Sequence, residues 1–363
     1  MTESVDPHHG VTHGEALRIV LEEVSADTPG FYNFARLMPY YPMCMLFFIT
    51  GERRIGKTFF FTRVMCRLYI EYGYQTVWLR NRLIELQDPA FATSFLADMK
   101  KLGYCPEEWD ARSDGVYTAK GDSGRLVCAF KSLSTFSNAR GGAWPDVAMI
   151  LLDEFQDEAG KFPKKACTGL LSLTKTIFSG RDGRCFLLSN SISCMNPYYA
   201  HFRIWPEQPV SVFEDKGICI EKCSGFYRRA IGRKNLWNRV YKAGVGYGDY
   251  ADESQDDRMN LIAPVPKGAE AVNWIVKANG NTYRAYTAKG RYYFKEFKGN
   301  AGQCIIYVTS NADLDGRAVM INTRMVKALG EMFKSGGARF QDANTMFDMM
   351  TVVFPSEIFG RRL

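Results

Sequence analysis

Eight consecutive residues, Gly51 to Thr58, have the types and spacing that bind nucleotide phosphates. They read GERRIGKT, with two glycines and a Lys-Thr pair at the end. Glycines at these positions let backbone N–H groups surround phosphate oxygens at the start of a helix. Lys57 is expected to reach the β- and γ-phosphates, and the Thr58 hydroxyl to bind Mg²⁺. The pattern predicts a P-loop for ATP with Mg²⁺, formed by Gly51, Glu52, Arg53, Arg54, Ile55, Gly56, Lys57 and Thr58.

A second part of the predicted site follows the apolar run MILL, which ends in Asp153 and Glu154. On its own, an acid pair in this position is equally consistent with a helix cap. Beside a P-loop it indicates a Walker B pair, in which Asp153 holds Mg²⁺ and Glu154 polarises the attacking water. The long separation from Lys57 includes a further strand, QTVWLR, which favours the ATPase branch over small nucleotide kinases.

Other polar side chains are placed where they could sense or accelerate hydrolysis. Asn190 follows Ser189 at the end of the apolar run FLLS, from which it could contact the γ-phosphate; a turn-forming asparagine is the alternative. A guanidinium can stabilise the transition state of phosphoryl transfer, although a loop arginine is often only a solvated charge. The arginine candidates are Arg53, Arg140, Arg181 and Arg184, of which Arg140 and Arg181 are the better candidates for reaching a neighbouring subunit.

These residues need a sheet that brings them to one edge, and the order of the predicted elements supplies it. Strands are expected at 45–50, 75–80, 147–155 and 184–191, with helices at 57–72, 89–102 and 164–178 and a hairpin within 115–130. Alternating strands and helices predict a parallel α/β sheet. Residues 1–40 are expected to form a partly ordered arm with one short amphipathic helix, GEALRIVLEEVS.

The composition changes after about residue 205. Residues 222–242 hold seven Lys and Arg and no acid, with apolar residues at helical spacing. From about residue 256 short strands separated by Gly and Asn turns precede a helical ending. Between residues 272 and 310 the only acid is Glu296, whereas a two-metal nuclease needs several carboxylates. This predicts a basic sheet that holds nucleic-acid phosphates without cutting them, with Lys277, Arg284 and Arg291 among its bases.

The overall composition is that of a soluble globular protein of 363 residues, with 46% hydrophobic and 23% charged residues. The formal charge is +7, although residues 1–30 are acidic, so the remainder favours a polyanionic partner; solubility alone is the alternative. Ten scattered cysteines predict reduced thiols, and four histidines leave no plausible metal cage. Because neither a membrane span nor a signal peptide is recognisable, we expect a cytoplasmic protein.

Four segments together resemble the DNA-encapsidation ATPases of the phi-twenty-nine-like tailed phages, which push double-stranded DNA into a preformed capsid. They are FFITGERRIGKTF, WPDVAMILLDEF, LSNSISCMNPYY and KALGEMFKSGGARFQDANTMFDMM. The resemblance runs from about residue 44 to 350 and is weak between 206 and 300. It implies a RecA-like P-loop ATPase domain of the additional-strand (ASCE) type at 41–205 and a helical linker at 206–255. It further implies a small α+β domain at 256–363, similar to a ribonuclease-H-like nuclease that has lost its active site.

The resemblance also implies partners and residue roles. The family forms a homomeric ring, thought of as a pentamer, at the portal vertex of the procapsid in the host cytoplasm. A packaging RNA is a further possible partner, and no membrane is involved. Lys57, Thr58, Asp153 and Glu154 match its catalytic motifs, Asn190 its coupling position and Arg53 an arginine of its P-loop. Arg140 matches a basic residue that acts across the subunit interface, and Arg181 lies one residue away from the arginine finger. Arg80 and Arg82 would line the ring and touch DNA.

Three other functions remain compatible with the sequence. The first is a regulatory or assembly ATPase that binds nucleic acid without translocating it. The second is a terminase-like motor that also cuts DNA, against which the scarcity of carboxylates in the C-terminal sheet speaks. The last is a small-molecule phosphotransferase, for which no acceptor site is recognisable. ATP-dependent DNA uptake into empty capsids distinguishes a translocase from the regulatory ATPase.

Overall fold

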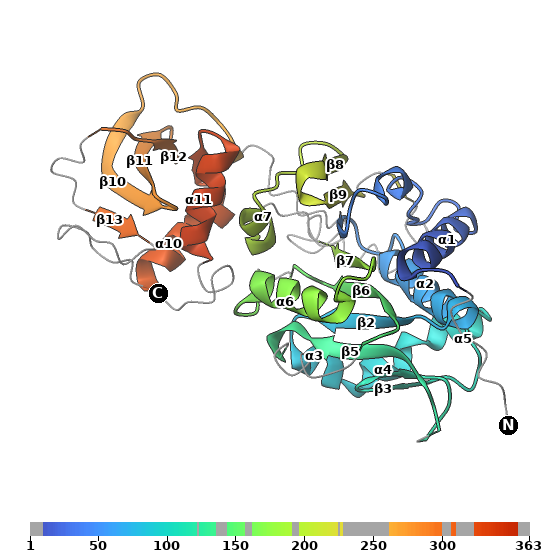
Figure 1. Cartoon of the computed structure of the whole chain (residues 1–363). Coiled ribbons are helices and arrows are strands. Elements are labelled where there is room, and N and C mark those ends of the chain that lie inside the picture. The colour runs from blue at the N-terminus through green and yellow to red at the C-terminus, as the bar shows by residue number, and fades with distance from the viewer. Residues whose placement is uncertain are drawn as a thin grey trace, which may run out of the picture. The chain divides into compact units, whose positions relative to one another are not determined.

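The computed structural model describes residues 10–121, 123–135, 144–156, 162–190, 196–223, 226–227, 261–299, 306–309 and 323–354. The chain divides into two compact units (Figure 1). The first comprises Met1–Pro163, Gly169–Ile192 and Pro206–Gln255, and the second comprises Lys164–Thr168, Ser193–Trp205 and Asp256–Leu363. Each unit has its own β-sheet. None of the helices in the described ranges has the length and apolar character needed to cross a bilayer.

The sheet of the first unit has, among the described residues, the strand order β3-β4-β5-β2-β6-β7-β1-β9-β8. The six central strands, β5-β2-β6-β7-β1-β9, are parallel to one another. Antiparallel strands flank them, β4 and β3 at one edge and β8 at the other. Strand β7 lies between β1, which precedes the P-loop, and β6, which precedes the acid pair. An inserted strand in this position defines the additional-strand ATPase fold, so the predicted fold class is confirmed. The bounds are β1 Leu46–Thr50, β2 Gln75–Arg80, β3 Asp110–Arg112, β4 Gly115–Tyr117, β5 Leu126–Ser132, β6 Val147–Asp153, β7 Arg184–Ser189, β8 Val210–Phe213 and β9 Ile218–Lys222.

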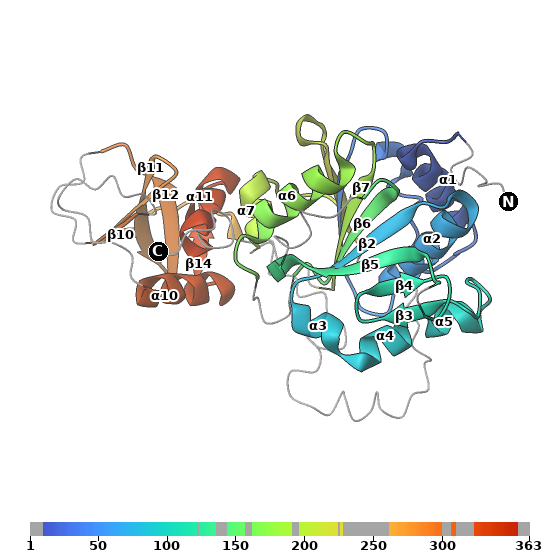
Figure 2. The same cartoon turned by 60° about the horizontal axis from the view of Figure 1, so that its bottom comes forward.

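Helices pack against this sheet and include one from the predicted N-terminal arm (Figure 2). Leu17, Val20 and Leu21 of α1 are fully buried and belong to the same apolar cluster as residues of β1, α2 and β7. Apolar residues at this spacing form one face of a helix, which explains why α1 packs on the domain. The amphipathic helix is therefore confirmed, but it is part of the first unit's core. The helices are α1 His13–Ala26, α2 Lys57–Tyr72, α3 Leu83–Gln87, α4 Pro89–Phe95, α5 Ala97–Lys101 and α6 Ala166–Phe178, with 3₁₀ turns at Met38–Tyr40 and Glu214–Lys216.

The described start of the predicted helical linker, residues 206–223, differs from the expectation. It forms β8 and β9, and β9 pairs in parallel with β1 from Leu46↔Ile218 to Thr50↔Lys222. Ile218 and Ile220 are buried, as a strand inside a sheet requires. The basic run on which the helical prediction rested lies almost wholly outside the described residues. This part of 206–255 is therefore an extension of the ATPase sheet.

The second unit contains a smaller sheet with the order β13-β10-β11-β12-β14 among its described residues. Strands β10, β11 and β12 are antiparallel, whereas β13 runs parallel to β10 and β14 parallel to β12. On one face, Phe294 and Phe340 pack against Phe333 of α10. The predicted small α+β domain is confirmed. Its elements are α7 Pro197–Phe202, β10 Glu270–Ala278, β11 Asn281–Ala288, β12 Arg291–Glu296, β13 Ile306–Thr309, α10 Thr323–Lys334, β14 Ala338–Phe340 and α11 Ala343–Val353.

Candidate functional site

The loop between β1 and α2 is shaped by two glycines in the left-handed region. Gly51 has φ 144° and Gly56, the residue before α2, has φ 98°. A Cβ at Gly51 would lie 2.8 Å from the Cβ of Cys223, so a larger residue would collide. The N–H of Gly51 donates to the carbonyl of Ser189 on β7. No side chain caps the first turn of α2, which leaves its N–H groups suited to an anion.

Lys57 occupies the centre of this loop. Its side chain is buried, and its Nζ donates to the carbonyls of Gly51 at 3.0 Å and Glu52 at 2.7 Å and to Oδ1 of Asn190 at 3.2 Å. Three acceptors match the three protons of the ammonium group. Burial lowers the pKa of Lys57 to about 8. The lysine is thus held in the loop by weak neutral acceptors, which phosphate oxygens can replace with gain.

Asn190 and Lys57 meet because β7 is the immediate neighbour of β1 in the sheet. Parallel strands that lie side by side end at the same edge, so the residue after β7 reaches the loop after β1. The predicted coupling residue therefore contacts the P-loop lysine directly, at 3.2 Å. Ser189, the last residue of β7, is buried, and its hydroxyl lies 3.5 Å from the carbonyl of Gln156.

The two predicted metal-binding side chains also lie together. The Thr58 hydroxyl is 3.4 Å from Oδ1 of Asp153, and Asp153 is 4% exposed. A hydroxyl and a carboxylate are hard oxygen donors, and Mg²⁺ in nucleotide sites commonly uses one or two such groups besides phosphate oxygens and water. Within the described residues no cluster of three or more His, Cys, Asp and Glu competes as a metal site. The donor set therefore fits Mg²⁺ bound together with a nucleotide.

Arg80, the last residue of β2, bridges the acid pair. Its Nη2 lies 2.9 Å from Oδ2 of Asp153 and its Nη1 lies 2.7 Å from Oε2 of Glu154. Burial alone would lower the pKa of Arg80, but the two carboxylates outweigh it and raise the pKa above its ordinary value. Arg80 was predicted to touch DNA. Its side chain is only 14% exposed and is paired with Asp153 and Glu154, so in this structure it does not present its charge to DNA.

Glu154 has an unusual backbone conformation, with φ 59°. Its carbonyl accepts a hydrogen bond from Nδ2 of Asn81 at 2.8 Å, and its side chain is about half exposed. A non-glycine residue in the left-handed region costs free energy and persists only where its surroundings impose it. No pattern in the sequence indicates a role for Asn81, which is brought to Glu154 by the adjacency of β2 and β6 in the sheet.

The predicted arginines are placed differently from one another. Arg53 is half-buried, and Arg54 is exposed with φ 63°. Arg181 donates from Nη2 to the carbonyls of Trp144 and Ile177, so its side chain is engaged within its own chain. Arg184 is buried, and its guanidinium lies over the ring of Tyr41 at 4.5 Å, which indicates a structural role. Arg140 lies outside the described residues.

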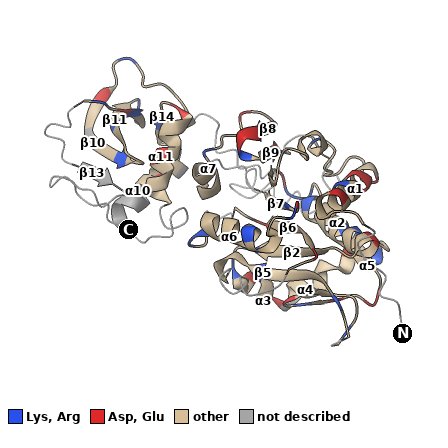
Figure 3. Ribbon diagram, viewed as in Figure 1, with Lys and Arg blue, Asp and Glu red and all other residues tan. Residues whose placement is uncertain are grey.

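The remaining predicted contacts to DNA lie mostly on the second sheet (Figure 3). Arg284 on β11 lies directly opposite Lys295 on β12, and opposite residues share a face of the sheet. Alternation along the strands places Arg291 and Lys277 on that same face. Among the described strand residues this face carries no carboxylate. We call Lys277, Arg284, Arg291 and Lys295 the basic face; Arg82, by contrast, is half-buried at the start of α3 in the first unit.

Comparison with known proteins gives consistent results. The sequence profile of the Podovirus DNA encapsidation protein (Gp16) family matches residues 26–352. The DNA packaging protein of Bacillus phage phi29 is 26% identical over 330 residues, which cover 87% of this chain and 95% of that protein. The DNA packaging protein of Bacillus phage PZA is also 26% identical, over 329 residues that cover 87% of this chain and 95% of that protein.

Two solved structures share the fold along most of the chain. One is described as the Phi-28 gp11 DNA packaging motor and has a TM-score of 0.65 at 17% identity, covering 90% of this chain and 98% of that one. The other is the bacteriophage Phi-29 viral genome packaging motor assembly, with a TM-score of 0.63 at 22% identity, covering 90% of this chain and 99% of that one. The likeness therefore includes both units of the fold.

The burial of Lys57 predicts a pH-dependent stability of the nucleotide-free protein. The pKa of Lys57 is lowered in the folded state to about 8, so between about pH 8 and 10.5 the unfolded chain binds more protons than the folded one. The free energy of unfolding of the wild type should therefore rise across this window, relative to a Lys57→Met variant, by up to about 3 kcal/mol. Chemical denaturation at several pH values measures this difference.

The exposed Lys101→Met substitution is the matched control for loss of a positive charge. A difference between the wild type and Lys57→Met that stays constant from pH 8 to 10.5 would contradict the depressed pKa.

Proposed function

The chain belongs to the Podovirus DNA encapsidation protein family, and on that basis we propose that it hydrolyses ATP to move double-stranded viral DNA into a preformed procapsid. The observation that carries the proposal is the arrangement at one sheet edge of Lys57, the Thr58–Asp153 pair and Glu154 bridged by Arg80. These are the parts that hydrolysis of a nucleoside triphosphate requires. A purely structural loop would not need a buried lysine in the loop together with an acid pair at the same sheet edge.

The chemistry follows from the residues of this edge. In the proposed mechanism Lys57 exchanges its carbonyl partners for β- and γ-phosphate oxygens, and Arg53 adds a second cation over the γ-phosphate. Thr58 and Asp153 would hold Mg²⁺, which when bound neutralises charge on the β- and γ-phosphates. Glu154 accepts a proton from the attacking water as general base.

Arg80 restrains this general base. Oε2 of Glu154 lies 2.7 Å from Nη1 of Arg80, and while this ion pair persists that oxygen is occupied by the guanidinium and not by a water. Before Glu154 can accept a proton from water through this oxygen, its ion pair with Arg80 must break. Arg80 can then remain paired with Asp153 alone. We propose that ATP is hydrolysed only when Arg80, at the end of β2, has released Glu154.

A homomeric ring completes the proposed site. Arg181 is committed to carbonyls of its own chain, so we assign the role of the residue acting in trans to Arg140. The proposed ring is a pentamer on the portal of the procapsid, in the host cytoplasm, and a packaging RNA is a further candidate component. The P-loop and acid pair come from one subunit, and Arg140 comes from the next.

The second unit is proposed to grip nucleic acid without cutting it. The basic face offers four cations on one side of the sheet, which suits backbone phosphates of any sequence. Asp348 of α11 is buried and already accepts hydrogen bonds from four side chains, so it is not free to serve as a nuclease metal ligand. This arrangement favours a translocase over a terminase-like motor with nuclease activity.

The proposed function is tested first by Glu154→Gln. The amide retains the size of the side chain but cannot accept a proton, so kcat for ATP should fall by about 10²- to 10⁴-fold while ATP binding persists. DNA uptake into empty procapsids should stop as well. The exposed Glu108→Gln is the matched control. ATP turnover by Glu154→Gln at the wild-type rate would refute the assignment, and ATPase activity without DNA uptake by the wild type would favour the regulatory alternative.

A mixing experiment tests the role of Arg140. Rings made only of Arg140→Ala, or only of Glu154→Gln, should both be inactive. Rings assembled from a mixture should recover ATPase activity, because some interfaces then combine an intact Glu154 with an intact Arg140 from the neighbour. If the mixture is as inactive as its components, Arg140 does not act in trans.

The basic face is tested by the double variant Arg291→Ala/Lys295→Ala, since both side chains are exposed and their loss should not disturb the fold. Binding to duplexes of unrelated sequence should weaken uniformly, and the slope of log affinity against log salt should fall by about 1 per removed phosphate contact. Lys267→Ala, an exposed lysine outside the strands, is the control. Cleavage of the duplex with Mg²⁺ or Mn²⁺, or unchanged binding, would contradict the proposal.

A further inference from the structure

The segment between β7 and β8 leaves the first unit and returns to it. Strand β7 pairs with one side of β1, and β9, preceded by β8, pairs with the other side. Residues 193–205 between them, which contain α7, belong to the second unit. Both ends of this excursion are therefore fixed to strands that flank the P-loop strand.

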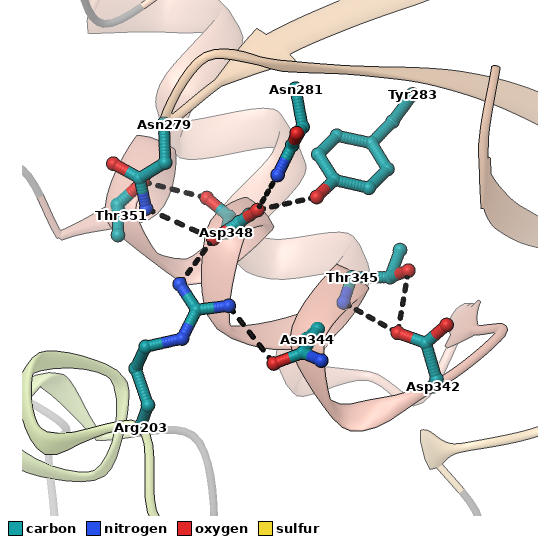
Figure 4. Close-up of polar contacts among 9 residues, drawn as sticks. All are labelled: Arg203, Asn279, Asn281, Tyr283, Asp342, Asn344, Thr345, Asp348 and Thr351. Carbon is teal, nitrogen blue, oxygen red and sulfur yellow. Dashed lines mark hydrogen bonds and ion pairs between the residues drawn. The ribbon is translucent and has the colours of Figure 1, made fainter. Parts of the chain in front are cut away.

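The excursion ends at a buried carboxylate of the second unit, Asp348 on α11 (Figure 4). Its side chain is 1% exposed. Oδ1 accepts from Nη1 of Arg203 at 2.7 Å and from Nδ2 of Asn279 at 3.0 Å. Oδ2 accepts from Nδ2 of Asn281 at 2.9 Å and from the hydroxyl of Tyr283. Burial raises the pKa of Asp348, but these hydrogen bonds outweigh it and the pKa lies below its ordinary value, so the group is a carboxylate.

Arg203 is the one donor among these four that comes from the excursion. It follows α7 with φ 52° and ψ 53°, a left-handed conformation that costs free energy for a non-glycine residue. Its Nη2 also donates to Oδ1 of Asn344 at 3.0 Å, so one guanidinium spans two residues of α11 (Figure 4). The strained backbone and the doubly engaged side chain indicate that the end of α7 is held firmly on α11.

The other three donors connect Asp348 to the DNA-facing sheet. Asn279 lies in the turn between β10 and β11, and Asn281 and Tyr283 lie on β11. The same two strands carry Lys277 and Arg284 of the basic face. Asp348 thus joins the end of the excursion to the base of the strands that are proposed to hold DNA.

At its other end the excursion starts from the nucleotide site. Asn190 accepts from Lys57 in the P-loop. Six residues further on, the buried Asn196 caps α7 by accepting from the N–H of Tyr199 at 2.9 Å. When Lys57 turns to phosphate oxygens, its bond to Asn190 must change, and Asn190 is covalently connected to α7.

We propose that Arg203 is a positioning residue that couples the nucleotide site to the DNA-binding sheet through its ion pair with Asp348. This inference rests on the proposed function, because coupling has meaning only in a motor that hydrolyses ATP and moves DNA. Arg203 touches neither the nucleotide nor the reacting atoms. Its loss leaves Asp348 with three donors from β11 and the turn before it, so the sheet of the second unit keeps its fold while its link to the excursion is weakened.

The test compares ATP consumed with DNA moved. Arg203→Ala should keep the rate of ATP hydrolysis within about twofold, whereas the ATP hydrolysed per base pair packaged should rise by at least about fivefold. Arg203→Lys, which retains the charge, should fall between this variant and the wild type. Asp348→Asn, which retains the shape, should share the defect of Arg203→Ala. Thermal unfolding of each variant reports whether the second unit remains folded.

Asp342→Ala is the matched control, because Asp342 caps the same helix through the N–H of Thr345 but does not contact Arg203 (Figure 4). Its ratio of ATP to DNA should equal that of the wild type. Arg203→Ala with a wild-type ratio would overturn the coupling role. If Arg203→Ala and Asp342→Ala each lost ATPase activity and packaging to the same extent, the role of Arg203 would be structural only. Failure of the wild type to package DNA would instead reject the proposed function itself.

Discussion

The ion pairs of Arg80 with Asp153 and Glu154 are the interaction around which the ATPase edge is built. Asp153 is almost fully buried, and a buried carboxylate without a partner would be strongly destabilising. Arg80 can serve as its partner because β2 pairs in parallel with β6 and ends at the same edge of the sheet. The sheet order therefore determines the charge balance of the site before any nucleotide is present.

The local parts of this site could be predicted from the sequence, whereas the contacts between strands could not. An apolar run followed by GERRIGKT, and another followed by Asp153 and Glu154, carry their signals in consecutive residues. The position of Arg80 gives no such signal, since its partners are more than seventy residues away and their proximity follows from the order β2-β6. The family resemblance implies a DNA contact for Arg80, and no local pattern in the sequence indicates its pairing with the acid pair instead. The same limit applies to Arg181, whose acceptors are backbone carbonyls that no side-chain pattern marks.

The boundary of the first unit shows how composition can obscure a strand. The run ICIEK is short, and it directly precedes a basic stretch whose apolar residues have helical spacing. The sequence therefore predicts a helical linker for 206–255 and does not reveal the strand. Its pairing with β1 buries Ile218 and Ile220 and extends the ATPase sheet beyond the predicted limit. In the second unit, by contrast, regular turns between apolar and basic strands made the small sheet predictable, because Gly and Asn at the turns mark each strand end.

The surroundings of Asp348 bear on two proposals for the second unit, namely that it does not cut DNA and that it is coupled to the nucleotide site. A two-metal nuclease keeps several carboxylates open toward its ions. Here the buried carboxylate of α11 is surrounded by amide, hydroxyl and guanidinium donors, and the guanidinium belongs to Arg203 of the excursion. A cation that is part of the chain neutralises the acid as a metal would, but it also carries the connection to Asn190 and the P-loop. Under the proposed coupling, the guanidinium that occupies Asp348 would also link the second unit to the nucleotide site.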